Sequence, residues 1–239
     1  MDKLITKDNI DIEILCIIPA RSGSKGIPNK NIKEFKGLPL LVHSIKQAQL
    51  SKYKMRIIVS TDSREYADIS IKYGAEVPFL RPENISQDLS TDYECIKHCI
   101  EWLKENKNYK SDIILHLRPT QPCRKVEDID KCLDIFIKNR KKYDSLRSVV
   151  PFEKSPYKMY TINDDLLIPL FNKCGSIVEP YNQCRQILPQ AYLHNGYIDI
   201  YKTECIKNDV LSGDKIYPYI MSSNDIIDID TDKDWKNII

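Results

Sequence analysis

The sequence carries little net charge, no closely paired cysteines and no long apolar run. A formal net charge of +2 provides no global field that would favour nucleic acid or a membrane, so any anion site must be local. None of the eight cysteines forms a C-x-x-C pair, so the usual zinc-binding spacing is missing. No stretch approaches the roughly 20 apolar residues of a membrane span. The opening residues, 1–14, mix acids with apolar residues, unlike a signal peptide. We therefore expect a cytoplasmic protein with free thiols.

The 239 residues are 42% hydrophobic and 29% charged, which is ordinary for a globular enzyme with a sizeable core. Apolar runs alternate with helical patterns along the first 150 residues. This alternation predicts an α/β fold with a doubly wound, mostly parallel sheet. The predicted strands are 12–19, 56–60, 76–79, 113–117 and 145–150, and the predicted helices are 40–50, 64–73, 92–105 and 126–138.

The pattern changes at residue 152. Residues 152–194 are rich in Pro, Tyr, Asn and Lys, and we interpret them as an irregular excursion within a single domain of residues 1–239. This segment is a candidate hairpin that packs on a second subunit. The later pattern predicts strands at 197–201, 217–221 and 226–229, a basic helix from Thr203 and a short helix at Trp235.

A basic, glycine-containing segment follows the first predicted strand: Arg21-Ser22-Gly23-Ser24-Lys25-Gly26-Ile27-Pro28-Asn29-Lys30-Asn31. Glycines let backbone N–H groups approach a ligand closely, and successive amides form an anion-binding concavity. Arg21, Lys25 and Lys30 add positive charge, as a triphosphate requires. The spacing is neither a P-loop nor a G-x-G-x-x-G fingerprint. A solvated basic turn is the alternative, although ligands gather at the carboxyl ends of parallel strands.

The segment IIPARSGSKGIPNKNI resembles the opening motif of the acylneuraminate cytidylyltransferases, which make CMP-sialic acid and its relatives. The resemblance covers nearly the whole chain. Further motifs follow in order: IIVSTD at 57–62, LRPENISQD at 80–88, LRPTQPCR at 117–124, RQILPQAYLHNG at 185–196 and IDIDTDKDW at 227–235. It implies a Rossmann-like fold of the nucleotide-diphospho-sugar transferase type with a protruding dimerisation element, hence a homodimer.

The resemblance also implies roles for individual residues. The phosphates and ribose of CTP would be held by the basic segment, and the cytosine by a pair in the third motif. The expected CTP-binding residues are Arg21, Ser22, Gly23, Ser24, Lys25, Lys30, Asn31, Arg81 and Gln87. Cytosine presents an amine and a carbonyl, so its pocket should mix donors and acceptors.

Asp228 and Asp230 are a candidate magnesium site. On a strand, positions i and i+2 point to the same face, so the carboxylates would converge while Ile227 and Ile229 enter the core. Mg²⁺ takes oxygen ligands and usually keeps waters and phosphate oxygens. The family places its metal ligands at the matching positions. The alternative is an edge strand with an acidic solvent face. We interpret Asp62 as a helix cap and not as a ligand.

The sugar acid would be bound by Arg118, Arg185, Gln186 and Asn195, by resemblance. A guanidinium suits a carboxylate because its forked donors bind both oxygens. Two positions depart from the sialic-acid pattern: Arg118 stands where those enzymes have Gln, and Leu193 where some carry Arg. One cation gained and one lost favour a legionaminate-type, diamino nine-carbon sugar acid over plain N-acetylneuraminate. The role of His194 is open.

The sequence thus predicts a Mg²⁺-dependent cytidylyltransferase, in the nucleotidyltransferase class, that transfers CMP from CTP to a nonulosonic acid used in cell-surface polysaccharides. Arg21, Lys25, Lys30, Asp228 and Asp230 are the candidate catalytic residues. Two alternatives stay open: a nucleotidyltransferase for another sugar or sugar phosphate, and a non-catalytic nucleotide-binding protein on the same fold.

Overall fold

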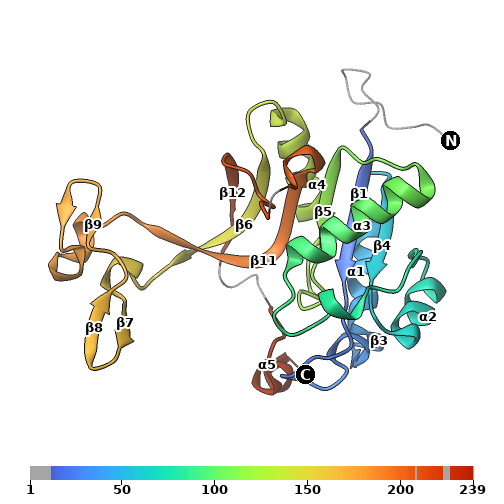
Figure 1. Cartoon of the computed structure of the whole chain (residues 1–239), viewed down its shortest axis with the longest axis horizontal. Coiled ribbons are helices and arrows are strands. Elements are labelled where there is room, and N and C mark those ends of the chain that lie inside the picture. The colour runs from blue at the N-terminus through green and yellow to red at the C-terminus, as the bar shows by residue number, and fades with distance from the viewer. Residues whose placement is uncertain (1–11, 208, 223–226, 239) are drawn as a thin grey trace. The chain divides into compact units, whose positions relative to one another are not determined.

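Two compact units make up the computed structural model, which describes residues 12–207, 209–222 and 227–238 (Figure 1). The first unit comprises Met1–Ser148, Gly196–Tyr219 and Ile226–Ile239, and the second comprises Val149–Asn195 and Ile220–Asp225. The second unit therefore contains the excursion predicted at 152–194. No helix in the described part of the chain is long and apolar enough to cross a membrane.

A six-stranded sheet with the order β12-β6-β11-β5-β1-β4 is the centre of the fold. β1 lies between β4 and β5 and is parallel to both, whereas β11 is antiparallel to β5. The resulting sheet is mostly parallel, as the strand–helix alternation predicts. The strands are β1 (Ile14–Pro19), β4 (Arg56–Ser60), β5 (Ile113–His116), β6 (Ser145–Phe152), β11 (Ala191–Lys202) and β12 (Ile216–Ile220).

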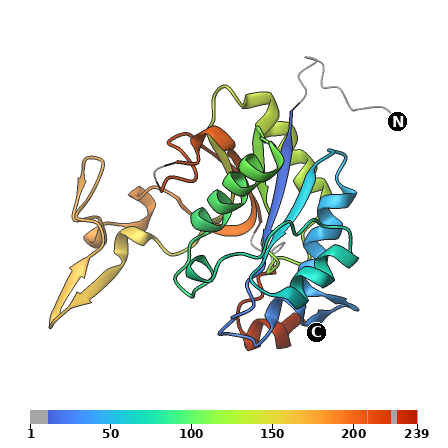
Figure 2. The same ribbon diagram turned by 45° about the vertical axis from the view of Figure 1, so that its right-hand side comes forward.

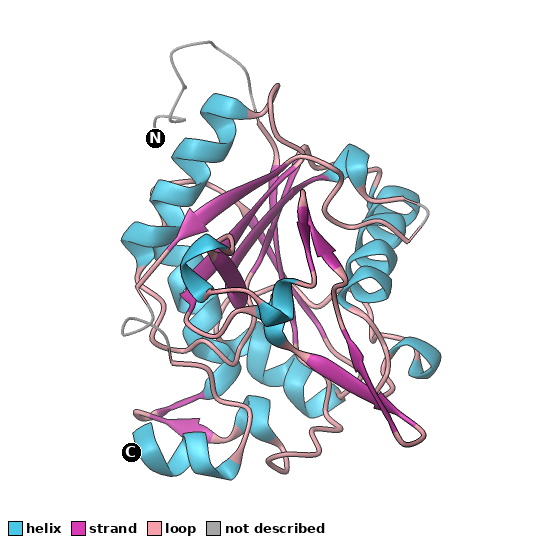
Figure 3. Cartoon of the chain, turned by 90° about the vertical axis from the view of Figure 1, so that its left-hand side faces the viewer, coloured by secondary structure: helices cyan, strands magenta, loops and turns pink. Residues whose placement is uncertain are grey.

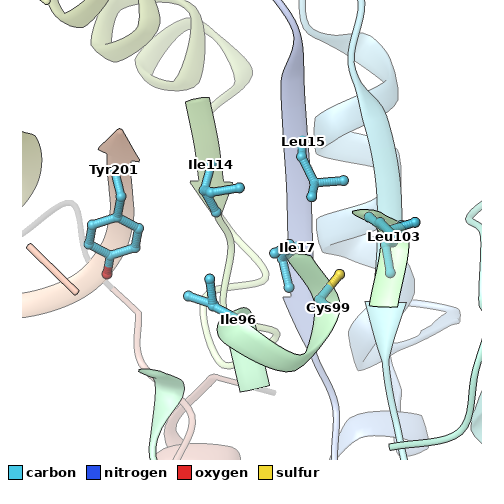
Figure 4. Close-up of a cluster of buried hydrophobic side chains, with 8 residues drawn as sticks. Leu15, Ile17, Ile96, Cys99, Leu103, Ile114 and Tyr201 are labelled. Atoms are coloured by element: carbon cyan, nitrogen blue, oxygen red, sulfur yellow. The ribbon is translucent and has the colours of Figure 1, made fainter. Parts of the chain in front are cut away.

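Helices cover the sheet of the first unit (Figure 3). They are α1 (Leu40–Leu50), α2 (Arg64–Lys72), α3 (Asp92–Lys107) and α4 (Val126–Asn139). The last helix, α5 (Asp232–Ile238), packs through Trp235 on Ile27, Phe35 and Leu40. Leu15 and Ile17 of β1 pack against Ile96, Cys99 and Leu103 of α3 (Figure 4). Because side chains alternate along a strand, Cys16 and Ile18 point to the other face. All of these side chains are almost completely buried, so β1 is a central strand of the core.

Short elements complete the first unit. They are the strands β2 (Glu34–Phe35) and β3 (Leu38–Pro39) and the 3-10 turns η1 (Lys30–Ile32), η2 (Glu83–Ile85) and η6 (Thr203–Cys205). Three sequence predictions need correction here. Residues 76–79 form only an isolated bridge, from Glu76 to Ile58, because the segment leaves the sheet edge at once. The helix expected from Thr203 is the single turn η6. Residues 227–229 form no regular strand, and residue 226 lies outside the described part.

The second unit contains two small hairpins (Figure 2). β7 (Tyr160–Asn163) pairs antiparallel with β8 (Leu166–Pro169), and β9 (Lys173–Cys174) pairs with β10 (Ile177–Val178). Three 3-10 turns complete it: η3 (Pro156–Lys158), η4 (Pro180–Asn182) and η5 (Arg185–Ile187). Large apolar side chains on β7 and β8 are exposed, Ile162 by 74% and Leu167 by 63%. A face of this kind is unusual on a monomer.

Candidate active site

The carboxyl ends of β4, β1 and β5 meet at one edge of the sheet, because these neighbouring strands are parallel. The basic segment, residues 21–31, follows β1 at this edge. The amide of Ala20 donates to the carbonyl of Ser60 at the end of β4, at 2.9 Å. The loop after β5 is joined to the acidic segment, since the Ile229 amide donates to the Thr120 carbonyl at 2.9 Å. Each sequence motif of the first unit therefore has its place at a common edge.

Apolar packing holds the basic segment against the acidic pair. Ile27 is 1% exposed and Ile229 is 0% exposed, and both belong to one buried cluster with Phe35, Leu40 and Trp235. Gly26 lies directly against the acidic segment: a Cβ atom there would be 2.5 Å from the Asp230 carbonyl oxygen. Lys25, next to Gly26 in the chain, and Asp230 therefore lie on the same side of the first unit.

Hydrogen bonds fix the path of the basic segment. The Asn31 side-chain amide, 7% exposed, donates to the Arg21 carbonyl at 2.9 Å and closes the loop. Both the amide and the hydroxyl of Ser22 donate to Asp62, each at 2.8 Å. Asp62 therefore positions the loop. The prediction that Asp62 caps a helix is wrong, because Ser63 is the N-cap of α2 and accepts from the Tyr66 amide.

The cations of the segment are paired with carboxylates. Arg21 and Lys25 both contact Asp88, at 2.9 and 2.5 Å, and Lys30 contacts Asp230 at 2.8 Å. The hydrogen bonds from Lys25 and Arg21 lower the pKa of Asp88. The Lys25 side chain is nevertheless 78% exposed, so a ligand can reach it. Asp88 belongs to the LRPENISQD motif, but spacing alone assigned it no role.

Asp228 and Asp230 offer the oxygen donors that Mg²⁺ prefers. Burial raises the pKa of Asp228, and the negative charge of Asp230 raises it further. A divalent cation between them would relieve that repulsion. The described residues contain no group of three His, Cys, Asp or Glu side chains that would hold a metal unaided. Two carboxylates supply some of the oxygen ligands of Mg²⁺, which usually takes the others from water and phosphate.

The residues expected to contact cytosine lie beyond β4. The Arg81 amide donates to the Thr61 carbonyl at 2.7 Å, and its guanidinium donates to the Ser60 carbonyl at 3.3 Å. Arg81 is 6% exposed, and its Nε has no hydrogen-bond partner within the described part of the chain. Gln87 is exposed, and its side chain donates to the Glu83 carbonyl at 2.9 Å. These groups supply the donors and acceptors that a cytosine pocket needs.

The residues expected at the sugar acid divide between the two units. Arg118 belongs to the first unit, where its guanidinium contacts Asp92 and Asp199. Arg185 and Gln186 are exposed on η5 of the second unit, and Asn195 belongs to the same unit. The Asn195 side chain donates to the Met221 sulfur at 3.8 Å. No sequence signal indicated the carboxylates that surround Arg118.

The fold is that of the nucleotidyltransferases. A solved CMP-2-keto-3-deoxy-manno-octonic acid synthetase complexed with CTP superimposes with a TM-score of 0.66 at 14% identity, over 95% of this chain and 96% of that one. A likeness at this identity establishes the architecture alone. In open parallel sheets of this architecture, ligands bind at the carboxyl ends of the strands, which is the edge described above.

The family follows from sequence comparison. Residues 15–166 match the family model described as Cytidylyltransferase, and the chain belongs to this family. It is 33% identical to the post-translational flagellin modification protein B of Campylobacter coli, over 94% of this chain and 92% of that protein. It is 34% identical to the CMP-N,N'-diacetyllegionaminic acid synthase of Legionella pneumophila, over 94% of both. It is 30% identical to a pseudaminic acid cytidylyltransferase of Campylobacter jejuni, over 93% of both. The chain is thus an enzyme of the nucleotidyltransferase class.

Proposed function

We propose that this protein transfers CMP from CTP to a nonulosonic, nine-carbon sugar acid and releases pyrophosphate. The observation that carries the proposal is the meeting of basic loop and acidic pair, with Gly26 against the Asp230 backbone and Lys30 paired to Asp230. A triphosphate needs both cations and a metal-binding carboxylate pair at one place. The relatives named for legionaminic and pseudaminic acid support the class of acceptor.

The residues of the first unit would perform the nucleotide chemistry. The anomeric hydroxyl oxygen of the acid would form a bond to the α-phosphorus, and the bond from that phosphorus to the bridging oxygen of pyrophosphate would break. Arg21, Lys25 and Lys30 would stabilise the charge that develops on the leaving pyrophosphate. Asn31 would fix the conformation of the loop and so keep these cations directed at the phosphates. Catalysis of this kind depends on positioning and electrostatics more than on a covalent intermediate.

Asp228 and Asp230 would hold Mg²⁺, which when bound neutralises phosphate charge. The same pair lies beside the loop cations, and either member would accept the proton of the attacking hydroxyl. Arg81 and Gln87 would contact the cytosine. The turn formed by Ser22, Gly23 and Ser24 would face the phosphates.

Arg185, Gln186 and Asn195 would bind the sugar acid. The exposed guanidinium of Arg185 suits the carboxylate, because its forked donors match two oxygens. Two departures from the sialic-acid pattern, Arg118 in place of Gln and Leu193 in place of Arg, favour a diamino acceptor of the legionaminate type over N-acetylneuraminate.

We also propose that the second unit mediates a homodimer. Exposed apolar side chains on β7, β8 and the following turn support this: Tyr160, Ile162, Leu166, Leu167, Ile168, Leu170 and Phe171. Burying such a surface against a second copy would remove it from water. A cytoplasmic location agrees with the eight free cysteines, none of which forms a disulfide.

The deciding experiment measures pyrophosphate release with Mg²⁺ and a panel of acceptors. The panel contains N,N'-diacetyllegionaminic acid, pseudaminic acid and N-acetylneuraminic acid, each with CTP, UTP or dTTP. We expect turnover with CTP alone and fastest turnover with the diamino acids. Turnover with a sugar phosphate and UTP would support a different nucleotidyltransferase. Calorimetric binding of CTP without turnover for any acid would support a non-catalytic binding protein.

Lys25→Ala tests the basic loop itself. Loss of a preorganised charge at the phosphates should lower kcat/KM for CTP about 100-fold. Lys104→Ala is the matched control, because Lys104 is an exposed lysine in the last turn of α3. Equal activity of the two variants would exclude a role for Lys25.

A further inference from the structure

Arg118 lies at the centre of an internal ion cluster in the first unit. Its Nη2 donates to Asp92 Oδ2 at 2.6 Å, and its Nη1 donates to Asp199 Oδ2 at 2.5 Å. The Arg118 side chain is 20% exposed, and the Asp199 side chain is 0% exposed. The Gly196 carbonyl accepts a further bond from Nη1 at 3.5 Å. The guanidinium is thus oriented by groups from two different elements, α3 and β11.

The charges of this cluster balance. Arg147 Nε lies 3.7 Å from Asp199 Oδ1 and supplies a second cation for the two carboxylates. Burial alone disfavours the Arg118 charge, but Asp199 and Asp92 together raise the pKa of Arg118 above its ordinary value. The cation is therefore stabilised by the protein's own carboxylates. A guanidinium held in this way makes a poor anchor for the carboxylate of a ligand, because binding would have to break buried charge pairs.

Asp92 connects the cluster to the segment from Arg81 to Asp88, which contains the residues expected to contact cytosine. It is the first residue of α3, directly after Thr91, which forms a capping box with Glu94. Asp88, four residues earlier, contacts Arg21 and Lys25 of the basic loop. The opposite end of the cluster is firmly placed, because Asp199 pairs with His116 in the ladder between β11 and β5.

We propose that Arg118 is a positioning residue for the nucleotide site: it ties Asp92 to Asp199 and thereby holds the segment from Arg81 to Asp88 against the sheet. The inference rests on the proposed binding of CTP at this edge. It replaces the direct contact with the sugar acid that resemblance suggested for Arg118. A displacement of about 1 Å at a binding segment is enough to change turnover strongly, so loss of the tie should weaken the binding of CTP.

The test is calorimetric titration of CTP with Mg²⁺ and no sugar acid. We expect the Kd for CTP to rise about tenfold in Arg118→Gln and in Asp199→Asn. The double variant Arg118→Gln/Asp199→Asn should bind CTP no more than about threefold more weakly than the single variant with the higher Kd, because both substitutions remove the same contact. Arg118→Lys should recover only part of the affinity, since one ammonium lacks the fork that reaches both carboxylates.

Arg56→Gln is the matched control. Arg56 makes a two-pronged pair with Glu76, at 2.8 and 2.6 Å, at the start of the edge strand β4. Its loss removes an ion-paired arginine of similar exposure, 21% against 20% for Arg118, at the opposite end of the parallel strands. We expect a Kd for CTP within about twofold of wild type. If Arg118 had a purely structural role, the two arginine variants would have similar CTP affinities when each is measured at the same interval below its own unfolding temperature.

Separate results refute the two proposals. If the wild-type protein fails to bind CTP, the proposed function is refuted, and so is the positioning role that rests on it. If the wild-type protein binds CTP and Arg118→Gln binds it with equal affinity, only the positioning role is refuted. A raised KM for N,N'-diacetyllegionaminic acid in that variant would then restore the direct contact. If Arg118→Gln does not fold, Asp92→Asn replaces it, because the Asp92 side chain is 40% exposed. Unchanged CTP affinity in Asp92→Asn overturns the proposal.

Discussion

A single added methyl group at Gly26 tests whether the basic loop and the acidic segment must lie in contact. The Cβ atom of Gly26→Ala would stand 2.5 Å from the Asp230 carbonyl oxygen, whereas real Cβ contacts essentially never fall below 3.0 Å. The two segments must therefore move apart by at least the difference, about 0.5 Å. The obstacle is backbone, so no side-chain rotation relieves it. Overpacking of this kind costs about 1–3 kcal/mol of stability.

The same displacement should also lower the activity of the folded variant. A displacement of between about 0.5 and 1 Å separates the loop cations from the carboxylates, and kcat/KM for CTP should fall about 10- to 100-fold. The assay is the initial rate of pyrophosphate release as a function of CTP concentration, at a temperature where thermal unfolding shows the variant to be folded.

Gly23→Ala provides the control within the same loop. A Cβ atom at Gly23 would meet only the end of the Arg21 side chain, at 3.5 Å, which is an ordinary contact. The thermal stability of this variant should match wild type, and any loss of kcat/KM would report on the approach of the phosphates to the turn and not on a displacement from the acidic segment. If Gly26→Ala and Gly23→Ala behave alike in both activity and thermal stability, the contact between loop and acidic segment is not required, and the proposed arrangement is refuted.

Three further predictions concern the acidic pair, the core and the second unit. Asp230→Asn should raise the Mg²⁺ concentration for half-maximal activity at least about tenfold, whereas Asp232→Asn should leave it unchanged; equal metal titrations would argue against ligation by Asp230. Burial lowers the pKa of His116 to about 4, so the unfolded chain takes up protons more readily than the folded one and stability falls as the pH drops from about 6.5 to about 4. This contribution amounts to about 3 kcal/mol, and urea unfolding of His116→Leu should show a correspondingly flatter pH dependence; an unchanged dependence would refute it. The double variant Ile162→Asp/Leu167→Asp, which alters a cross-strand pair, should shift light-scattering mass from dimer to monomer, and Leu89→Asp, at an exposed leucine of the first unit, should not; a dimer in both variants would place the interface elsewhere.

Local sequence patterns predicted the parts of the fold that depend on local chemistry. The apolar run of β1 and the helical pattern of α3 each become elements close to their expected bounds, since burial on a central sheet enforces them. Glu76 shows the limit of such reasoning, because it bridges to Ile58 of β4 but the segment after it leaves the sheet edge, which its apolar residues do not indicate.

The candidate site was predictable in its motifs but not in its pairings. Arg118 is separated from Asp92 by 26 residues and from Asp199 by 81, so spacing along the chain carries no sign that its charge is balanced. The role of Asp62 was equally unpredictable from the sequence. Its neighbour Ser63 caps α2, and Asp62 instead accepts a hydrogen bond from Ser22, 40 residues earlier. Such contacts arise only once the parallel strands bring their carboxyl ends together.

The pairing of the loop cations with Asp88 and Asp230 has a consequence for selectivity among anions. Any incoming anion must compete with these carboxylates for Arg21, Lys25 and Lys30. A small ion such as sulfate would engage fewer of these cations than a polyphosphate chain, which would replace several contacts at once. In the proposed function, the loop would therefore select ligands by the number of negative charges that they present together.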